Sequence, residues 1–331
     1  MKVKTKIIAL LLMAVMLITF TSCGTDTPSD NNGTTAGEVS NTVSEENEEN
    51  GESETQPVID KDREGNSITL PQTIDKIISM GPSNTEVLVA LGFGDRIIAA
   101  DSYSENVEGI PSGIPMFSMM SPDGEQIIAL QPDVIFVTGM SKVDGDDPFK
   151  IISDTGICII YIPSSSSIDG IKEDIKYMAN VMGAQSKGDT IISYMETEIA
   201  AVKAVGDTIT DKKRVYFEIS AAPYMYSFGK GTFLNEMIEL IGAANVLGDQ
   251  ESWISVADEA VVDANPDVIL TSVNYIENPT DEIKSRPGWD GLTAVQNGDV
   301  YYIDTDSSNR PSQNIIKALK EMAKFVYPDK Y

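Results

Sequence analysis

Two copies of one short phrase, with a long helical stretch between them, predict an α/β protein built from two similar lobes. The copies are Ala129-Leu-Gln-Pro-Asp-Val-Ile-Phe136 and Ala264-Asn-Pro-Asp-Val-Ile-Leu270. In each copy Pro stops a helix, Asp turns the chain, and the β-branched apolar run is typical of a buried strand. A repeated phrase on either side of one helix favours two lobes over the alternative, a single large α/β domain with a chance repeat.

Residues 168–207 are predicted to link the lobes as a helix. An apolar stripe down one face of it, at steps of four, four and three residues, consists of Ile191, Met195, Ile199 and Val202. Gly183 and Gly188 are expected to divide the stretch into a shorter and a longer helix.

The first lobe, residues 58–167, is predicted from an alternation of strands and helices. A short hairpin at 58–70 precedes strands at 77–80, 97–100, 134–138 and 158–162 and helices at 86–91, 124–130 and 149–155. Ser83, Asn84 or Thr85 can cap the first helix, and Gly92 ends it. Cys158 lies between two isoleucines, so we expect it to be buried as a small apolar residue.

The second lobe, residues 208–331, repeats the alternation. Strands are predicted at 214–219, 268–272 and 300–304, and helices at 233–241, 258–264, 281–284, 289–295 and 315–327. Thr232 caps the first of these helices, residues 221–231 form a loop, and residues 307–311 cap the last helix. Such alternation predicts two Rossmann-like lobes with mainly parallel sheets. Ligands of such sheets bind at the carboxyl ends of the strands, so we expect a ligand cleft between the lobes.

The composition excludes several classes of function. The net charge of −27 argues against nucleic acid, because phosphate contacts need clustered Lys and Arg. The chain has no histidine, the usual zinc ligand and general base, so we expect no metal site and no Ser-His-Asp triad. Two cysteines, Cys23 and Cys158, do not suggest a disulfide framework.

Residues 1–22 have the features of a lipoprotein signal peptide. The first six residues include three lysines. The apolar run from Ile7 to Phe20 that follows is short for a membrane span. The run ends in Phe20-Thr-Ser-Cys23-Gly24, which resembles a bacterial lipobox, although Phe20 stands where Leu is usual. We therefore expect lipidation of Cys23; the alternative is an ordinary secretory signal with a nearby cysteine. Residues 23–57 are acidic and poor in large apolar side chains, which indicates a disordered tether.

Three motifs together resemble one family of transport proteins. They are Gly81-Pro-Ser-Asn-Thr-Glu-Val-Leu-Val-Ala-Leu-Gly92, Glu125-Gln-Ile-Ile-Ala-Leu-Gln-Pro-Asp-Val-Ile135 and Asn309-Arg-Pro-Ser312. With the long linking helix, they resemble the helix-hinged substrate-binding proteins of ABC importers, which take up cobalamin, ferric siderophores or haem. The Ser-Asn-Thr-Glu loop is most similar to the cobalamin-binding branch. The resemblance implies delivery of a corrinoid to an ABC permease and its ATPase. We further expect a monomer without a cofactor, anchored through the lipid on Cys23.

The resemblance also implies roles for individual residues. Tyr103 matches a tyrosine that packs on the ligand. Met119 stands where the cobalamin-binding branch has a tryptophan against the corrin face, which is a departure from the pattern. Glu125 and Glu239 match two surface glutamates, one per lobe, that dock on arginines of the permease.

Without the family, the same region still has candidate ligand contacts. Aromatic and methionine side chains in loops could line a cleft, and we select Tyr103, Met119, Met120, Tyr226 and Trp253. Arg310 could bind an anionic group or could instead pair with Asp304 or Asp306. On residue chemistry alone, Glu125 and Glu239 belong to a solvated face.

Other functions remain as alternatives. The ligand could be a ferric siderophore or haem in place of a corrinoid. A lipid-anchored α/β hydrolase is disfavoured by the absence of histidine and of a Gly-x-Ser-x-Gly elbow. A binder of bare zinc or manganese would need imidazole ligands, and a structural surface lipoprotein would not need aromatic loops.

Overall fold

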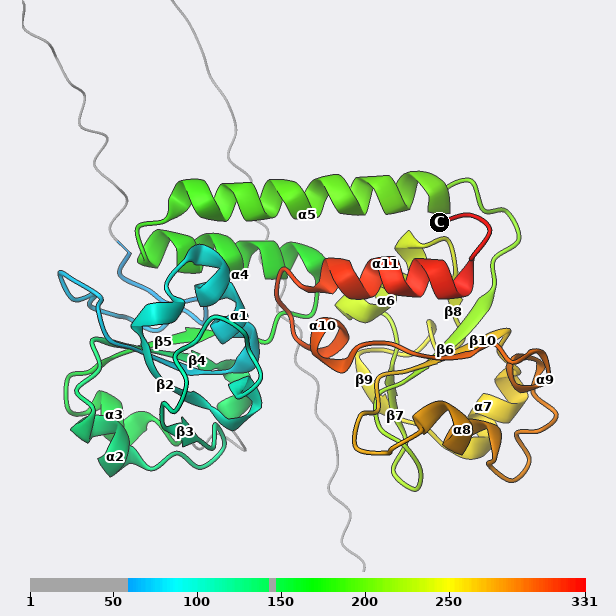
Figure 1. Ribbon diagram of the computed structural model, residues 1–331, viewed down its shortest axis with the longest axis horizontal. Coiled ribbons are helices and arrows are strands. Elements are labelled where there is room, and N and C mark those ends of the chain that lie inside the picture. The colour runs from blue at the N-terminus through cyan, green and yellow to red at the C-terminus, as the bar shows by residue number, and fades with distance from the viewer. Residues whose placement is uncertain (1–58, 143–146) are drawn as a thin grey trace, which may run out of the picture. The chain divides into compact units, whose positions relative to one another are not determined.

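The computed structural model describes residues 59–142 and 147–331 (Figure 1). The predicted signal peptide at 1–22, the tether at 23–57 and the lipidation site Cys23 lie outside these residues. Within them the chain forms two parallel sheets and one antiparallel strand pair. The predicted α/β class with mainly parallel sheets is therefore confirmed.

The first sheet has the strand order β3-β2-β1-β4-β5, and all its pairings are parallel. Its strands are β1 (Ile77–Met80), β2 (Ile97–Asp101), β3 (Met116–Phe117), β4 (Val134–Thr138) and β5 (Cys158–Ile162). The helices around it are α1 (Pro82–Leu91), α2 (Gly124–Ala129) and α3 (Lys150–Ser153), with single turns at Gly94–Arg96, Ser102–Ser104 and Gly139–Ser141. We call this part of the chain the first lobe.

The second sheet has the order β11-β10-β6-β8 and is also parallel. Its strands are β6 (Arg214–Glu218), β8 (Ala244–Asn245), β10 (Val268–Thr271) and β11 (Val300–Tyr302), and the antiparallel pair is β7 (Tyr226–Phe228) with β9 (Trp253–Ser255). The helices are α6 (Phe233–Leu240), α7 (Asp258–Ala264), α8 (Pro279–Lys284), α9 (Thr293–Asn297), α10 (Thr305–Asn309) and α11 (Ile315–Val326). We call this part the second lobe.

Two helices, α4 (Ile168–Val181) and α5 (Gln185–Gly206), connect the lobes (Figure 1). Helix α5 packs against α4 and against helices of both lobes, α1 of the first and α6 and α11 of the second. The break between them contains Gly183 at a φ of +66°, as predicted, because glycine adopts that conformation freely. The predicted division into a shorter and a longer helix is confirmed, but the part assigned to Gly188 in it is wrong. Gly188 lies inside α5, where an added Cβ would come 2.5 Å from the Ala179 Cβ, so it permits close packing of α4 on α5.

The repeated phrase performs the same structural task in each lobe. The residue before its proline, Gln131 or Asn265, has a positive φ and ends the preceding helix. The aspartate that follows the proline then binds backbone amides at the start of the central strand. Asp133 accepts from Asp75 and Lys76, each at 2.8 Å, and Asp267 accepts from Arg214 at 2.7 Å. The phrase is thus a structural repeat.

Several predicted boundaries differ from the structure. Helix α1 begins at Pro82 and not at Glu86, because proline is favoured at a first helical position, where no intrahelical N–H bond is lost. Residues 226–228 are a strand within the predicted loop. Residues 305–309 form a helix of their own, and α11 begins after Asn314, so the predicted cap at 307–311 is wrong. The predicted helix at 289–295 is found at Thr293–Asn297.

One core cluster runs from the first sheet through α4, α5 and α11 to the second sheet, and a further cluster covers the other face of each sheet. The predicted stripe on α5 belongs to the shared cluster, with Met195 and Val202 buried. Cys158 is half-buried at the edge of this cluster, and desolvation raises the pKa of its thiol to about 11, so it stays protonated and unreactive. Continuous apolar packing therefore joins the lobes along the linking helices.

Candidate functional site

Most of the large apolar side chains that stay exposed lie at or beyond the carboxyl ends of the parallel strands or on the β7–β9 pair. In the first lobe these are Tyr103, Met120 and Met140, and in the second they are Tyr224, Tyr226, Trp253, Tyr275 and Tyr302. Exposed aromatic side chains concentrated at one edge of each sheet are not explained by core packing, and they are typical of a ligand surface.

Tyr103 is held in place by a buried polar turn after β2. Its backbone N–H donates to Asp101 at 2.9 Å, and the Ser104 hydroxyl donates to the same carboxylate at 2.5 Å. Ser104 in turn lies 2.9 Å from the hydroxyl of Thr85 on α1. Burial raises the pKa of Asp101, and the bonds from Ser104 and Tyr103 offset part of that shift. Hydrogen bonds thus hold the backbone of the turn, whereas the Tyr103 side chain is 65% exposed and free to contact a ligand.

Arg310 joins the two lobes at this edge. Its guanidinium donates to Glu86 at 2.8 Å and to the Tyr103 carbonyl at 2.9 Å, both in the first lobe. It also pairs with Asp306 at 2.7 Å, one of the two alternatives that the sequence left open, whereas Asp304 pairs with Lys317. Ser312 adds a hydrogen bond to Glu86 at 2.5 Å. Arg310 is thus committed to partners within the protein and fixes the approach of the two strand edges.

In the second lobe, the strand pair β7–β9 presents two of the predicted contact residues. Tyr226 pairs with Ser255 and Phe228 pairs with Trp253 across it. The Trp253 ring also meets the rings of Phe228 and Phe233 edge-on, at 6.0 and 6.2 Å. Because Trp253 and Tyr226 are each 38% exposed, they combine a fixed position with an open face.

Beneath that surface lies a buried ionic cluster that the sequence did not reveal. Arg286 bonds to Glu218, at the end of β6, at 2.6 and 2.9 Å, and to Glu282 on α8. Its guanidinium also lies 4.6 Å from the centre of the Trp289 ring. Burial raises the pKa of Glu218, and Arg286 opposes that shift. Although burial alone would lower the pKa of Arg286, its two carboxylate partners raise it.

The remaining candidates divide between surface and core. Met120 is exposed, but Met119 is half-buried against the core of the first lobe, and Met225 is buried with its sulfur 3.3 Å from Arg286. Sequence reasoning missed Met140 and Tyr275, although each follows a predicted strand within three residues. It also missed Tyr302, because the predicted strand extended past it.

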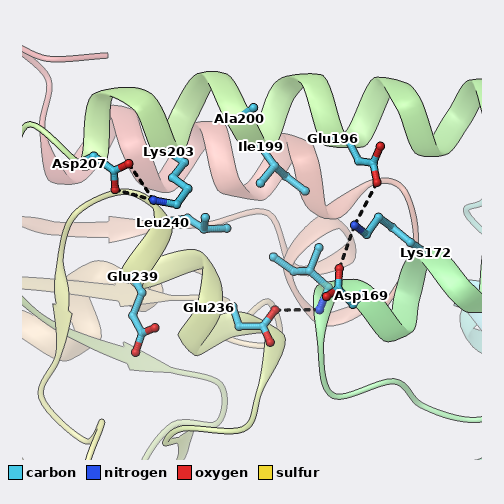
Figure 2. Close-up of a pocket in the computed structure, with 11 residues that line it drawn as sticks. Asp169, Lys172, Glu196, Ile199, Ala200, Lys203, Asp207, Glu236, Glu239 and Leu240 are labelled. Atoms are coloured by element: carbon cyan, nitrogen blue, oxygen red, sulfur yellow. Dashed lines mark hydrogen bonds and ion pairs between the residues drawn. The ribbon is translucent and has the colours of Figure 1, made fainter.

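The two predicted docking glutamates lie in different surroundings. Glu125 is exposed on α2, and its carboxylate has no partner among the described residues. Glu239 lies on α6, where it accepts from Asn235 at 2.9 Å and lines a groove of about 590 Å³ between α4, α5 and α6 (Figure 2). Its neighbour Glu236 accepts the N–H of Ile168 at 2.8 Å.

The structural repeat indicates a different residue as the counterpart of Glu125 in the second lobe. Glu125 stands seven residues before Pro132 on α2, and Glu259 stands seven residues before Pro266 on α7. Glu259 is exposed and likewise has no side-chain partner in the described part of the chain. By position in the fold, Glu259 and not Glu239 corresponds to Glu125.

Within residues 59–142 and 147–331, no group of three or more carboxylate, imidazole or thiol side chains is placed to hold a metal ion. No helix in that part has both the length and the apolar character needed to cross a membrane.

Comparison with known proteins places this arrangement in a family. The family model for periplasmic binding proteins matches residues 77–307. The chain belongs to that family. An uncharacterized ABC transporter substrate-binding lipoprotein of Bacillus subtilis, YvrC, is 30% identical over 280 residues, covering 83% of this chain and 87% of the relative.

Two further proteins extend the comparison. The vitamin B12-binding protein of Vibrio parahaemolyticus is 25% identical over 76% of this chain and 89% of its own length. A possible iron-binding protein of Staphylococcus epidermidis, of known structure, superposes with a TM-score of 0.69 at 27% identity over 77% of this chain and all of the other. The resemblance to substrate-binding proteins of ABC importers is confirmed. The chain is such a substrate-binding component and not an enzyme, which removes the hydrolase alternative.

Proposed function

We propose that this protein captures a cobalamin-like corrinoid outside the cytoplasm and delivers it to an ABC permease driven by its ATPase. The observation that carries the proposal is the concentration of exposed aromatic and methionine side chains at the strand ends of both lobes. Such side chains offer wide, apolar and adaptable contact area to a large flat ligand. Arg310 keeps the two surfaces close together through Glu86.

The relatives support this ligand class and one alternative. A vitamin B12-binding protein is among the relatives with extensive coverage, which favours the corrinoid. The iron-binding neighbour favours a ferric siderophore or haem instead. Met119, which stands where the cobalamin-binding branch has a tryptophan, is half-buried and has no aromatic ring to stack on a corrin face, which disfavours a corrinoid relative to the iron chelates.

The experiment is a visible absorption spectrum of protein purified from its host, followed by titration of the stripped protein. Corrinoids, haem and ferric siderophores absorb at different wavelengths, so one spectrum separates the three. Saturable binding of cyanocobalamin with a dissociation constant below that for haemin and for ferric chelates supports the proposal. Tighter binding of haemin or a ferric chelate would contradict the corrinoid proposal and support iron-chelate uptake.

We also propose that lipid on Cys23 anchors the protein to the membrane. The short apolar run that ends at Cys23 supports this, as does the naming of YvrC as a lipoprotein. Each buried acyl CH₂ stabilises the bound state by about 0.8 kcal/mol, so several chains hold a soluble domain firmly. Replacement of Cys23 by alanine should move the protein from the membrane fraction to the soluble fraction. Undiminished membrane association of the variant would refute the lipid anchor.

A further inference from the structure

The N-terminus of α1 has no side-chain cap. It lies at the carboxyl end of β1, the middle strand of the first sheet, at the edge where we expect the ligand. Its N-cap residue, Gly81, supplies no side-chain hydrogen bond, and the first turn contains no acidic residue. The backbone N–H groups of Ser83 and Asn84 have no acceptor among the described residues. Helix α1 follows β1, the middle strand of its sheet, between the strands that lead to Tyr103 and Met140.

A buried side chain adds a third free donor at the same place. Asn84 is only 2% exposed, and its Nδ2 has no hydrogen-bond partner in the described structure. A Cβ added to Gly81 would lie 3.3 Å from that Nδ2 and 3.1 Å from the Thr138 Cβ, so Nδ2 lies beside the N-cap, and a larger residue there would crowd it. Buried amide donors are almost always paired in native proteins, because an unpaired one is destabilising.

The corresponding asparagine in the second lobe is paired through both its backbone N–H and its side chain. Helix α6 also has an asparagine, Asn235, as its third residue, but the N–H of Asn235 donates to the Thr232 hydroxyl at 3.2 Å. The Asn235 side chain donates to Glu239 at 2.9 Å and accepts from Asn245 at 3.0 Å. An asparagine is thus the third residue of a helix in each lobe. The side chain of Asn235 is hydrogen-bonded within the protein, whereas the Nδ2 of Asn84 has no partner in the described structure.

We infer that the N-terminus of α1, with the backbone N–H groups of Ser83 and Asn84 and the Asn84 side-chain amide, is a subsite for an oxyanion of the captured ligand, a carboxylate or a phosphate. This inference rests on the proposed function, because it places the subsite on the surface that takes the ligand. Unpaired N–H groups and the positive end of the helix dipole both favour an anionic oxygen. Glu86, the acidic residue nearest along α1, is neutralised by Arg310 and does not oppose this charge.

Matched ligand pairs and a matched variant test the subsite. Haemin compared with its dimethyl ester tests the two propionate carboxylates, which the ester masks. Cyanocobalamin compared with dicyanocobinamide tests the phosphodiester, which cobinamide lacks together with the attached nucleotide. Asn84→Leu should weaken the member that carries the oxyanion by about tenfold and leave its blocked partner unchanged, since a hydrogen bond to a charged group is lost. The melting temperature of Asn84→Leu should equal or exceed that of wild type, because no internal bond is removed. The control Asn235→Leu breaks internal bonds and should lower the melting temperature.

Equal affinity of wild type for both members of each bound pair, unchanged by Asn84→Leu, would overturn the subsite and leave ligand capture intact. If wild type binds none of the four compounds, the capture proposal fails, and titration with inorganic phosphate decides the subsite. The amide resonances of Ser83 and Asn84 and the Asn84 side-chain resonances should then shift saturably in wild type, and the backbone shifts should be smaller in Asn84→Leu. Unmoved resonances in wild type would overturn the inference.

Discussion

The two lobes make equivalent contacts at the amino ends of their central strands, but their carboxyl ends differ. At the amino ends, Asp133 and Asp267 bind the backbone before β1 and at the start of β6 in the same way. At the carboxyl ends, the first lobe has hydroxyl groups around Asp101 and an open helix terminus, whereas the second has the buried Glu218–Arg286 pair beneath a group of exposed aromatic rings.

This difference separates what forms the fold from what serves a ligand. Contacts that start a strand must be kept in both lobes, because each lobe needs a parallel sheet. Side chains beyond the strand ends are not needed for the sheet, so they can diverge toward different parts of one ligand. The lobes are therefore expected to respond alike to changes at the amino ends and differently at the carboxyl ends.

The largest expected effect concerns the surface through which we expect the two lobes to dock on the permease. Glu125→Arg combined with Glu259→Arg should abolish uptake in cells, because the two exposed carboxylates occupy equivalent places and would repel arginines of a docking partner. Affinity of the purified double variant for its ligand and its melting temperature should match wild type, since neither glutamate has a side-chain partner in the described structure.

The matched comparison is Glu125→Arg with Glu239→Arg, the pair that the sequence suggests. Glu239 is bonded to Asn235 and faces the groove beside α5, so this pair should impair uptake less. Stronger loss of uptake in the Glu239 pair would show that the equivalence of the lobes does not extend to docking. Loss of ligand binding in either pair would assign these glutamates to the fold.

A second prediction concerns the ionic cluster that distinguishes the second lobe. Arg286→Met should lower the free energy of unfolding by about 3–5 kcal/mol, because Glu218 would remain buried without its cation. Urea denaturation measures this. The double variant Glu218→Leu with Arg286→Met should recover most of the loss, since no lone charge remains buried. If the single variant loses less than about 1 kcal/mol, the pair is not a major stabilising feature of this lobe.

Much of the fold could be predicted from the sequence because local signals and tertiary packing agree. Strands β4 and β5 and helix α7 were predicted with their correct bounds, since β-branched runs and the Pro-Asp pair mark them clearly. Errors arose where a short element depends on a distant partner. Strand β7 is only three residues long and exists because β9 pairs with it, which no local pattern shows.

The candidate site was less accessible to sequence reasoning. Exposed aromatic residues such as Tyr103 and Tyr226 could be selected, because loops with several rings are unusual. The pairing of Arg310 with Glu86 could not, because the two residues are 224 positions apart and lie in different lobes. The open terminus of α1 was hidden for another reason. Ser83, Asn84 and Thr85 all favour caps, whereas the structure places all three inside the helix.

A third prediction tests how unevenly the lobes share the ligand contacts. Among the described residues Tyr103 is the one exposed aromatic side chain of the first lobe, whereas the second lobe has several. Tyr103→Ala should therefore weaken binding of the cognate chelate by about 1–3 kcal/mol, as for an aromatic anchor in a desolvated site. Tyr302→Ala should have a smaller effect, because neighbouring rings remain. Calorimetry on both variants decides; a larger loss for Tyr302→Ala would reverse the assignment.

The smallest expected effect concerns two aspartates, one in each lobe, whose pKa values are shifted in opposite directions. Asp101 is the last residue of β2 and Asp304 follows β11, and each caps the next helical turn. Burial raises the pKa of Asp101 above its ordinary 3.8. Burial alone would raise that of Asp304 too, but bonds from Ser307 and the charge of Lys317 outweigh it, so the pKa is lowered.

The direction of each pKa shift determines how the stability that the aspartate contributes changes with pH. A raised carboxyl pKa means that stability contributed by Asp101 is fully present below pH 3.8 and is lost as pH rises through the raised value. A lowered pKa means that the contribution of Asp304 is present above pH 3.8 and is lost as pH falls through the lowered value. Urea denaturation from about pH 3 to about pH 7 should therefore show the stability of Asp101→Asn, relative to wild type, improving with rising pH, and that of Asp304→Asn worsening. Parallel pH trends for the two variants would mean that the carboxyl edges of the lobes are electrostatically alike, contrary to the contrast between Asp101 among hydroxyl groups and Asp304 beside Lys317.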